Sequence, residues 1–181
     1  LSLYYVPESL TVVGGGVIAC EWASIFQNLG VRVSLVNRWP RPLGFLDPEL
    51  SEVFLKAFLA DGGKYVGEAD IQSVEWDGAS AVRTTLATGP AIESEHMLVA
   101  YGRQANVQSL GLDRIGLGPN AKGLLDVDRN YQTAVPGVYA VGDVIGAPAL
   151  AATAMEQGRR AVCHALGLES GDFSGLIRSE E

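Results

Sequence analysis

The sequence predicts an α/β fold that begins with a βαβ unit, and three observations predict it. A β-branched apolar run, Leu10-Thr11-Val12-Val13, has the composition of a buried parallel strand. The run breaks into Gly14-Gly15-Gly16, and helical spacing of apolar residues follows from Val17 to Leu29. Gly30 ends that helix and a second apolar strand, Val31–Val36, follows at once. Strand, glycine turn, helix and strand within this length form a βαβ unit.

The glycine turn matches the dinucleotide-binding pattern G-x-G-x-x-[GA] as Gly14-x-Gly16-x-x-Ala19. Gly14 permits the tight turn, Gly16 lets the backbone approach a pyrophosphate, and Ala19 allows close packing of helix on strand. The helix N-terminus offers free N–H groups and a positive dipole end to phosphates. A glycine-rich turn that binds nothing is the alternative, and the flanking strands and helix favour a Rossmann-like nucleotide site. The helix face toward the sheet is predicted to carry Val17, Ile18, Trp22, Ile25, Phe26 and Leu29.

The end of the second strand predicts which nucleotide binds. In a Rossmann unit an acidic residue there binds the ribose 2′-hydroxyl of NAD, whereas a nearby arginine accommodates the 2′-phosphate of NADP. Asn37 occupies this place, Arg38 and Arg41 follow, and no Asp or Glu occurs between Glu21 and Asp47. We therefore expect NADP(H) to be accepted through the two guanidinium groups, with NAD(H) not excluded. Ordinary solvated loop charges are the alternative for the arginines.

The middle of the chain predicts a helix and an antiparallel appendage. Asp47 as N-cap and Pro48 in the first turn predict a helix that runs to about Ala60. Asp77-Gly78 is typical of a hairpin turn. Short strands are expected at 64–66, 71–75, 82–87 and 93–100.

Two further segments place a glycine after an apolar strand. The strand ending at Ala100 runs into Tyr101-Gly102-Arg103, where Gly102 either admits a ligand or simply ends the strand. The second, 138–143, is predicted to be a buried strand that ends at Gly142-Asp143. Asp143 either accepts hydrogen bonds from sugar or polyol hydroxyls or caps the following helix, expected at about 149–166. That helix begins with small residues, which let a ligand approach its free N–H groups.

Composition excludes several classes of function. The formal net charge of −8 argues against a nucleic-acid partner, and no apolar run is long enough to span a membrane. The two cysteines, Cys20 and Cys163, and the two histidines have no metal-ligand spacing, so we expect no metal site and free, buried thiols. The first residues resemble no signal peptide, and we expect a cytoplasmic protein. A start at Leu1 directly before a strand fits a segment of a longer protein.

Taken together, these motifs resemble the pyridine nucleotide–disulfide oxidoreductase family. The resemblance covers about residues 8 to 166 and lies in three segments, Gly14–Glu21, Val99–Arg103 and Thr133–Asp143, in the family's order. Within the family the chain is most similar to the soluble pyridine nucleotide transhydrogenases, through residues 21–26, 45–49 and 131–146. Ala19 departs from the glycine that we expect at this position in that group. At this position the chain instead resembles the NADP-using glutathione reductases.

The resemblance implies the roles of individual residues. Glu21 would lie near the nicotinamide and the flavin, and Asp143, after Gly142, would bind the ribityl or pyrophosphate part of FAD. Ala151 would place a backbone N–H near the FAD. Ile71 and Gly102 would line the nucleotide cleft. The pyrophosphate of NADP or NAD would be held by Gly14, Gly15, Gly16, Val17, Ile18 and Ala19.

The resemblance also implies a domain organisation. Residues 1–106 would form the NAD(P)-binding domain, and residues 107–168 the C-terminal half of an FAD-binding domain. Residues 169–181 would lead toward a dimerisation domain outside this chain, so that the whole protein would form a homodimer or higher homo-oligomer.

Three functions are compatible with these features. The first is the nucleotide-binding segment of an FAD-dependent enzyme that transfers hydride between NAD(H) and NADP(H). The second is a segment of an NADPH-dependent disulfide reductase or dihydrolipoamide dehydrogenase, which a redox-active cysteine pair outside this chain would distinguish. The third is an isolated, non-catalytic dinucleotide-binding domain. By itself the chain is expected to be colourless and inactive.

Overall fold

A four-stranded parallel sheet forms the centre of the first part of the chain in the computed structural model, which describes residues 3–169. The strand order is β3-β2-β1-β7, and Val12 in β1 lies opposite Leu35 in β2 and Leu98 in β7. The predicted βαβ unit is therefore confirmed. The elements are β1 (Ser9–Val13), α1 (Val17–Asn28), β2 (Arg32–Val36), α2 (Pro48–Ala60), β3 (Lys64–Val66) and β7 (His96–Val99).

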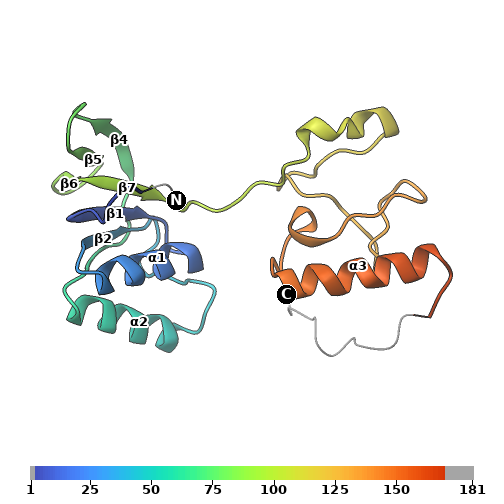
Figure 1. Ribbon diagram of the computed structural model, residues 1–181, viewed down its shortest axis with the longest axis horizontal. Coiled ribbons are helices and arrows are strands. Elements are labelled where there is room, and N and C mark those ends of the chain that lie inside the picture. The colour runs from blue at the N-terminus through green and yellow to red at the C-terminus, as the bar shows by residue number, and fades with distance from the viewer. Residues whose placement is uncertain (1–2, 170–181) are drawn as a thin grey trace. The chain divides into compact units, whose positions relative to one another are not determined.

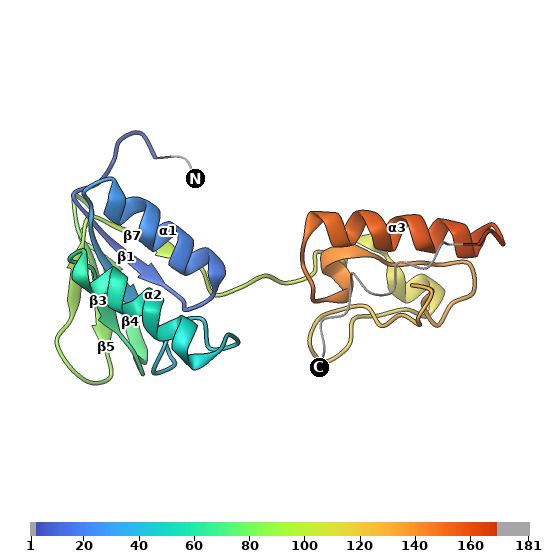
Figure 2. The same ribbon diagram turned by 90° about the horizontal axis from the view of Figure 1, so that it is seen from below.

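The predicted antiparallel appendage forms a second sheet, which covers the face of the parallel sheet opposite the helices. Its strands are β4 (Ile71–Trp76), β5 (Val82–Leu86) and β6 (Ile92–Ser94). Figures 1 and 2 show α1 and α2 on one side of the parallel sheet and this second sheet on the other. A buried hydrogen bond of 2.8 Å between the Thr11 and Ser94 hydroxyls joins the two sheets. Both helices share a face because right-handed crossovers lead from β1 to β2 and then to β3 in one direction.

The face of α1 toward the sheet differs from the predicted one. Its buried side chains are Ala19, Cys20, Ala23 and Phe26, and Trp22 is half-buried. The small side chains of Ala19, Cys20 and Ala23 let the helix lie close to the strands. The prediction was wrong for Val17, Ile18, Ile25 and Leu29, which are exposed.

The predicted strand 93–100 is two strands in two sheets. β6 ends at Ser94, β7 begins at His96, and Glu95 lies between them where the chain passes from one sheet to the other. The Ser94 hydroxyl donates to the carbonyl of His96 at 2.9 Å. β6 pairs with β5 whereas β7 pairs with β1, and a local sequence pattern does not show which partner a strand takes.

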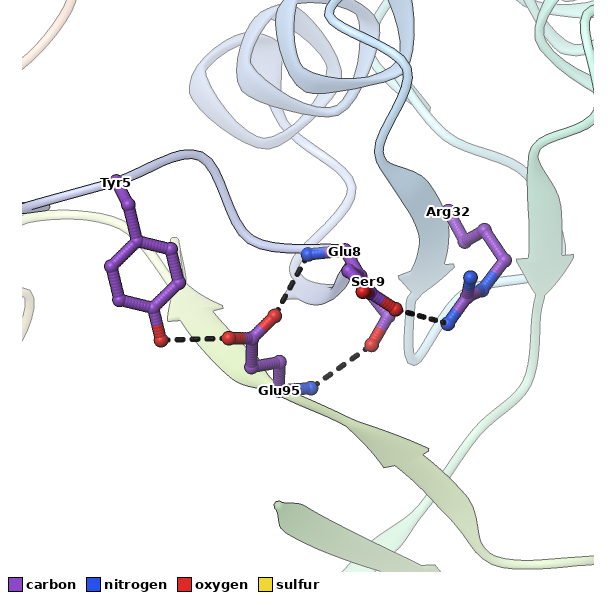
Figure 3. Close-up of polar contacts among 5 residues, drawn as sticks. All are labelled: Tyr5, Glu8, Ser9, Arg32 and Glu95. Atoms are coloured by element: carbon purple, nitrogen blue, oxygen red, sulfur yellow. Dashed lines mark hydrogen bonds and ion pairs between the residues drawn. The ribbon is translucent and has the colours of Figure 1, made fainter. Parts of the chain in front are cut away.

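Glu95 fastens the N-terminal segment to this crossing (Figure 3). Its carboxylate accepts hydrogen bonds from the Tyr5 hydroxyl at 2.7 Å and from the Glu8 N–H at 2.8 Å. Its own N–H donates to the Ser9 hydroxyl at 3.0 Å. Glu8 in turn lies 3.7 Å from the Arg32 guanidinium. The hydrogen bonds from the Tyr5 hydroxyl and the Glu8 N–H lower the pKa of the Glu95 carboxyl, that from Tyr5 most.

We expect Glu95→Gln to lower the melting temperature slightly at pH 7 and to lower it less at pH 3. A group whose pKa is depressed in the folded protein stabilises it above the unfolded pKa, and this stabilisation is lost as pH falls through the folded value. Thermal unfolding of both proteins at the two pH values measures the difference. A difference that is as large at pH 3 as at pH 7 would show that the carboxylate charge is not what holds the segment in place.

The second part of the chain is a separate unit, which begins at Arg103. The boundary predicted from the sequence lies a few residues later, near residue 106. Its small core consists of Val107, Leu125 and Ala140. The expected tail after Glu169 lies outside the described residues. No helix within residues 3–169 is both long and apolar enough to cross a membrane. The unit's elements are η1 (Gln108–Leu110), η2 (Leu112–Ile115), η3 (Gly142–Ile145) and α3 (Ala151–Ala165).

The strand predicted at 138–143 does not form. The segment makes a single antiparallel bridge, between Gln132 and Tyr139, and turns into η3 at Gly142. A strand needs a neighbouring ladder, and the described part of the chain supplies only this bridge. The helix predicted at 149–166 begins two residues later, with Leu150 as its N-cap. Cys163 is free and half-buried, whereas Cys20 is free and buried.

Candidate functional site

The first two glycines of the turn are required by the fold itself. Gly14 has φ = +130°, and a Cβ there would lie 2.5 Å from the carbonyl oxygen of Ala100. Its N–H donates to the carbonyl of Val36 at 2.8 Å, which ties the turn to the end of β2. A Cβ on Gly15 would lie 2.3 Å from the side-chain amide nitrogen of Asn37. Both positions exclude a side chain because of neighbours within the protein.

Gly16 is not required by the fold. It is the N-cap of α1 with φ = −83° and ψ = −177°, a conformation that any residue adopts, and no atom lies within 4 Å of the place of a Cβ. The space beside it is part of two clefts. Gly16 therefore leaves the backbone open toward a cleft rather than toward the protein.

The larger of these clefts, here called the main cleft, has a volume of about 590 Å³ and lies at the carboxyl ends of the parallel strands. Open α/β sheets bind ligands at this edge. The main cleft is lined by Gly14, Gly16, Asn37, Arg38, Trp39, Ala69, Asp70, Ile71, Ala100, Tyr101 and Gly102. The structure thus brings together six of the predicted site residues, from the ends of β1, β2 and β7 and the start of β4.

The N-terminus of α1 faces the glycine turn without a side chain of its own to cap it. No acidic residue occurs in the first turn, and Val17 and Ile18 are exposed there. Its unsatisfied N–H groups and positive dipole end favour an anion. Ala19 is fully buried beneath the turn, so its role is packing. Glu21 is exposed on α1 and does not line the main cleft.

Asn37 supports the loop that carries the arginines. Its side-chain amide donates to the carbonyl of Arg41 at 3.0 Å and to the hydroxyl of Tyr65 at 3.1 Å. The amide N–H of Ala69 donates to the Asn37 carbonyl at 2.9 Å, and that of Leu43 donates to the Gly15 carbonyl at 2.6 Å. The side chain is buried and still borders the main cleft. Asn37 therefore holds loop 38–43 against both β3 and the glycine turn.

The two predicted arginines lie in different clefts. Exposed Arg38 lines the main cleft, whereas half-buried Arg41 lines a side cleft of about 450 Å³ beyond Trp39. Neither forms an ion pair with a carboxylate among residues 3–169. We expected both arginines to pair with one 2′-phosphate. In this arrangement a single phosphate could contact both only if the ligand extended past Trp39.

Five residues that line the main cleft were missed by the sequence analysis: Trp39, Ala69, Asp70, Ala100 and Tyr101. The sequence has no Asp or Glu near the two arginines, but the structure places the Asp70 carboxylate in the same cleft as Arg38. Asp70 reaches this cleft because it follows β3, the strand next to β2. Its carboxylate accepts a hydrogen bond from the Gln72 side chain at 3.2 Å. The rule that ligands meet the carboxyl ends of adjacent strands could have indicated it.

In the second unit, Asp143 lies at the start of η3 and pairs with Arg103. The guanidinium and carboxylate are 2.6 Å apart, and both side chains are at least half exposed. Such an exposed pair adds little stability, about 0–1 kcal/mol, so its main effect is to orient the carboxylate. The alternative that Asp143 caps the following helix is wrong, because Leu150 is the N-cap of α3. No local pattern could indicate a partner 40 residues away.

Gly142 and Ala151 complete this second group of predicted residues. Gly142 is buried with φ = +77°, and its N–H donates to the Gln157 side-chain oxygen of α3 at 2.7 Å. That bond joins η3 to α3. Ala151 is the first residue of α3, is exposed, and has no acidic residue or capping side chain beside it. The unit thus presents an exposed carboxylate and a free helix N-terminus.

The sheet, its glycine turn and the cleft above it define an α/β protein of the Rossmann type. A family model described as pyridine nucleotide-disulphide oxidoreductase matches residues 1–158. The chain belongs to this family, whose members are FAD-dependent oxidoreductases. The resemblance stated from the sequence motifs is confirmed.

Its curated relatives include soluble pyridine nucleotide transhydrogenases from several bacteria. The chain is 44% identical over 161 residues to that of Chromohalobacter salexigens and 46% identical over 162 residues to that of Hahella chejuensis. Each match covers 89% of this chain, and 35% and 34% of the relatives. The chain thus spans about a third of the length of these proteins.

Solved structures show the same fold. LpdA from Mycobacterium tuberculosis matches with a TM-score of 0.87 and 34% identity, over 94% of this chain and 37% of that protein. The HOCl-induced flavoprotein disulfide reductase RclA from Escherichia coli matches with a TM-score of 0.86 over 95% of this chain and 39% of that protein. At 23% identity, the second likeness concerns the fold alone.

Proposed function

We propose that this chain is the nucleotide-binding segment of an FAD-dependent oxidoreductase that transfers hydride between NAD(H) and NADP(H). Its first unit binds the nicotinamide dinucleotide in the main cleft. The pyrophosphate lies over Gly14–Gly16 at the N-terminus of α1, and the adenosine extends toward Arg38. The names of the curated relatives support the transhydrogenase assignment.

Gly16 carries this proposal. A turn that served only the fold would need glycine at Gly14 and Gly15, where a Cβ collides with protein atoms, and could accept a side chain at Gly16. An open position that borders both clefts beside an uncapped helix N-terminus suits a phosphate held by backbone N–H groups.

The second unit supplies residues that suit FAD, the cofactor that the family implies. The exposed Asp143 carboxylate accepts hydrogen bonds from ribityl hydroxyls, while the free N–H groups that begin α3 at Ala151 suit a phosphate or a reduced flavin ring. FAD, when bound, would supply the two-electron carrier between the nucleotides. Arg103 would keep the carboxylate oriented.

A disulfide reductase is the second candidate, since the family model that matches residues 1–158 is described as pyridine nucleotide-disulphide oxidoreductase. Both candidates use the same cleft for the nicotinamide nucleotide. An assay of the full-length protein separates them: NADPH-driven reduction of an NAD⁺ analogue supports the transhydrogenase, and NADPH-driven reduction of a disulfide supports the reductase.

We expect Arg38→Ala to lower the affinity for NADP⁺ roughly tenfold or more, since a hydrogen bond to a charged group contributes about 1.5–3 kcal/mol. The affinity for NAD⁺, which lacks the 2′-phosphate, should stay unchanged. Calorimetric titration of this chain with both nucleotides at low ionic strength measures the two dissociation constants.

Arg83→Ala is the matched control for this experiment. It removes the same charge from the antiparallel sheet, where Arg83 pairs with Glu93, and should change neither affinity. A strong preference for NAD⁺ with no loss in Arg38→Ala would refute the assignment of Arg38 to the 2′-phosphate.

A further inference from the structure

Trp39 stands between the two clefts. Among residues 3–169 only Gly16 and Trp39 line both of them, and Arg38 lines the main cleft whereas Arg41 lines the side cleft. The side cleft is completed by Gly15, Pro40, Gly44 and Phe45. A large aromatic ring therefore separates the two arginines near the glycine turn.

The indole is exposed on a backbone that is held in place. Trp39 is 67% exposed. Its carbonyl accepts hydrogen bonds from the Tyr65 hydroxyl at 3.1 Å and from the Glu68 N–H at 3.2 Å. A Cβ on Gly67 would lie 3.2 Å from this same carbonyl, so the segment that follows β3 packs closely against the backbone of Trp39. The backbone that carries the ring therefore loses little conformational entropy when a flat ligand covers the ring.

We propose that Trp39 stacks on the adenine ring of the dinucleotide and provides affinity that NAD and NADP share. This inference rests on the proposed function of the main cleft. In the strand order β3-β2-β1-β7, Trp39 follows β2, the strand whose end meets the adenosine ribose. Tyr101 and Gly102 follow β7 on the other side of the glycine turn, where the nicotinamide half of the ligand extends.

Stacking explains how one cleft accepts both nucleotides. An aromatic face attracts the base irrespective of the 2′ substituent, since stacking needs no hydrogen-bond pattern. Arg38 then acts only on the 2′-phosphate. Trp39 sets the affinity common to both nucleotides, and Arg38 sets the ratio between them.

The test compares Trp39→Ala with Trp39→Phe and with Phe45→Ala. Loss of one stacking ring lowers affinity roughly tenfold. We expect this loss in Trp39→Ala for NADP⁺, NAD⁺ and AMP alike, with an unchanged ratio of the first two and no effect on nicotinamide mononucleotide. Trp39→Phe should restore most of the affinity. Phe45, 68% exposed and lining only the side cleft, is the matched aromatic control, and its removal should leave NAD⁺ and AMP binding unchanged.

The readouts are calorimetry and tryptophan fluorescence in a Trp76→Phe background, which removes the other exposed indole. Quenching by AMP that disappears in Trp39→Phe supports the stack. If wild type binds NADP⁺ or NAD⁺ and Trp39→Ala binds equally well, or loses only NADP⁺, the stacking proposal is overturned while the proposed function stands. If wild type binds neither nucleotide, the proposed function itself fails and the stacking proposal with it.

Discussion

Gly16→Ala should leave the first unit folded and lower its affinity for NADP⁺ and NAD⁺ at least tenfold. The new Cβ meets no protein atom within 4 Å, and the backbone at φ = −83° suits alanine. Alanine is a poorer N-cap than glycine by about 0.5–1 kcal/mol, and the reduced freedom of the unfolded chain returns about 0.4–1 kcal/mol. The free energy of unfolding should therefore change by less than about 1 kcal/mol.

Binding is affected because the methyl group occupies the space that the proposed pyrophosphate enters. Loss of hydrogen bonds from backbone N–H groups to a charged phosphate costs about 1.5–3 kcal/mol, which corresponds to tenfold or more in the dissociation constant. Titration with each nucleotide gives this constant, and a thermal melt of the same sample checks the fold. Gly16→Ala that binds both nucleotides like wild type would remove the observation on which the proposed function depends.

Much of the first unit could be predicted from the sequence because its determinants are local. The beginning of α2 follows from Asp47, whose carboxylate accepts the Glu49 N–H at 2.9 Å, and from Pro48 at the first helical position. The end of α1 follows from Gly30 with φ = +85°. In the motif Gly14-x-Gly16, Gly14 meets a conformational requirement of the turn and Gly16 leaves space for a ligand beside the backbone. Both are properties of a short segment.

What the sequence analysis missed depends on contacts between distant segments. Asp70 enters the main cleft only because β3 pairs with β2, and Arg103 meets Asp143 across 40 residues. The inward face of α1 was wrong because apolarity alone does not show how close a helix lies to its sheet. The requirement for glycine at Gly15 could not be derived either, since it comes from the Asn37 side chain packed behind the turn.

The other two glycines of the turn should respond to alanine in the opposite way to Gly16, and Gly14→Ala should be the most damaging. Its Cβ would lie 2.5 Å from a backbone oxygen, that of Ala100, which cannot move without disturbing β7. In addition, φ = +130° is strained for alanine. Strain and overpacking each cost about 1–3 kcal/mol, so the expected loss in the free energy of unfolding is about 4 kcal/mol.

Gly15→Ala should fall between these two. Its Cβ meets the amide of Asn37, a side chain that can turn aside by giving up its hydrogen bonds to the Arg41 carbonyl and the Tyr65 hydroxyl. All three tryptophans, Trp22, Trp39 and Trp76, belong to the first unit, so tryptophan fluorescence during urea unfolding reports on that unit alone. From the most stable to the least stable, the expected order of the variants is Gly16→Ala, Gly15→Ala, Gly14→Ala. Equal stability of Gly14→Ala and Gly16→Ala would contradict the arrangement of β1 and β7 around the turn. The predicted order would instead show that folding requires Gly14 and Gly15. The third glycine of the same turn, Gly16, would then be required for nucleotide binding.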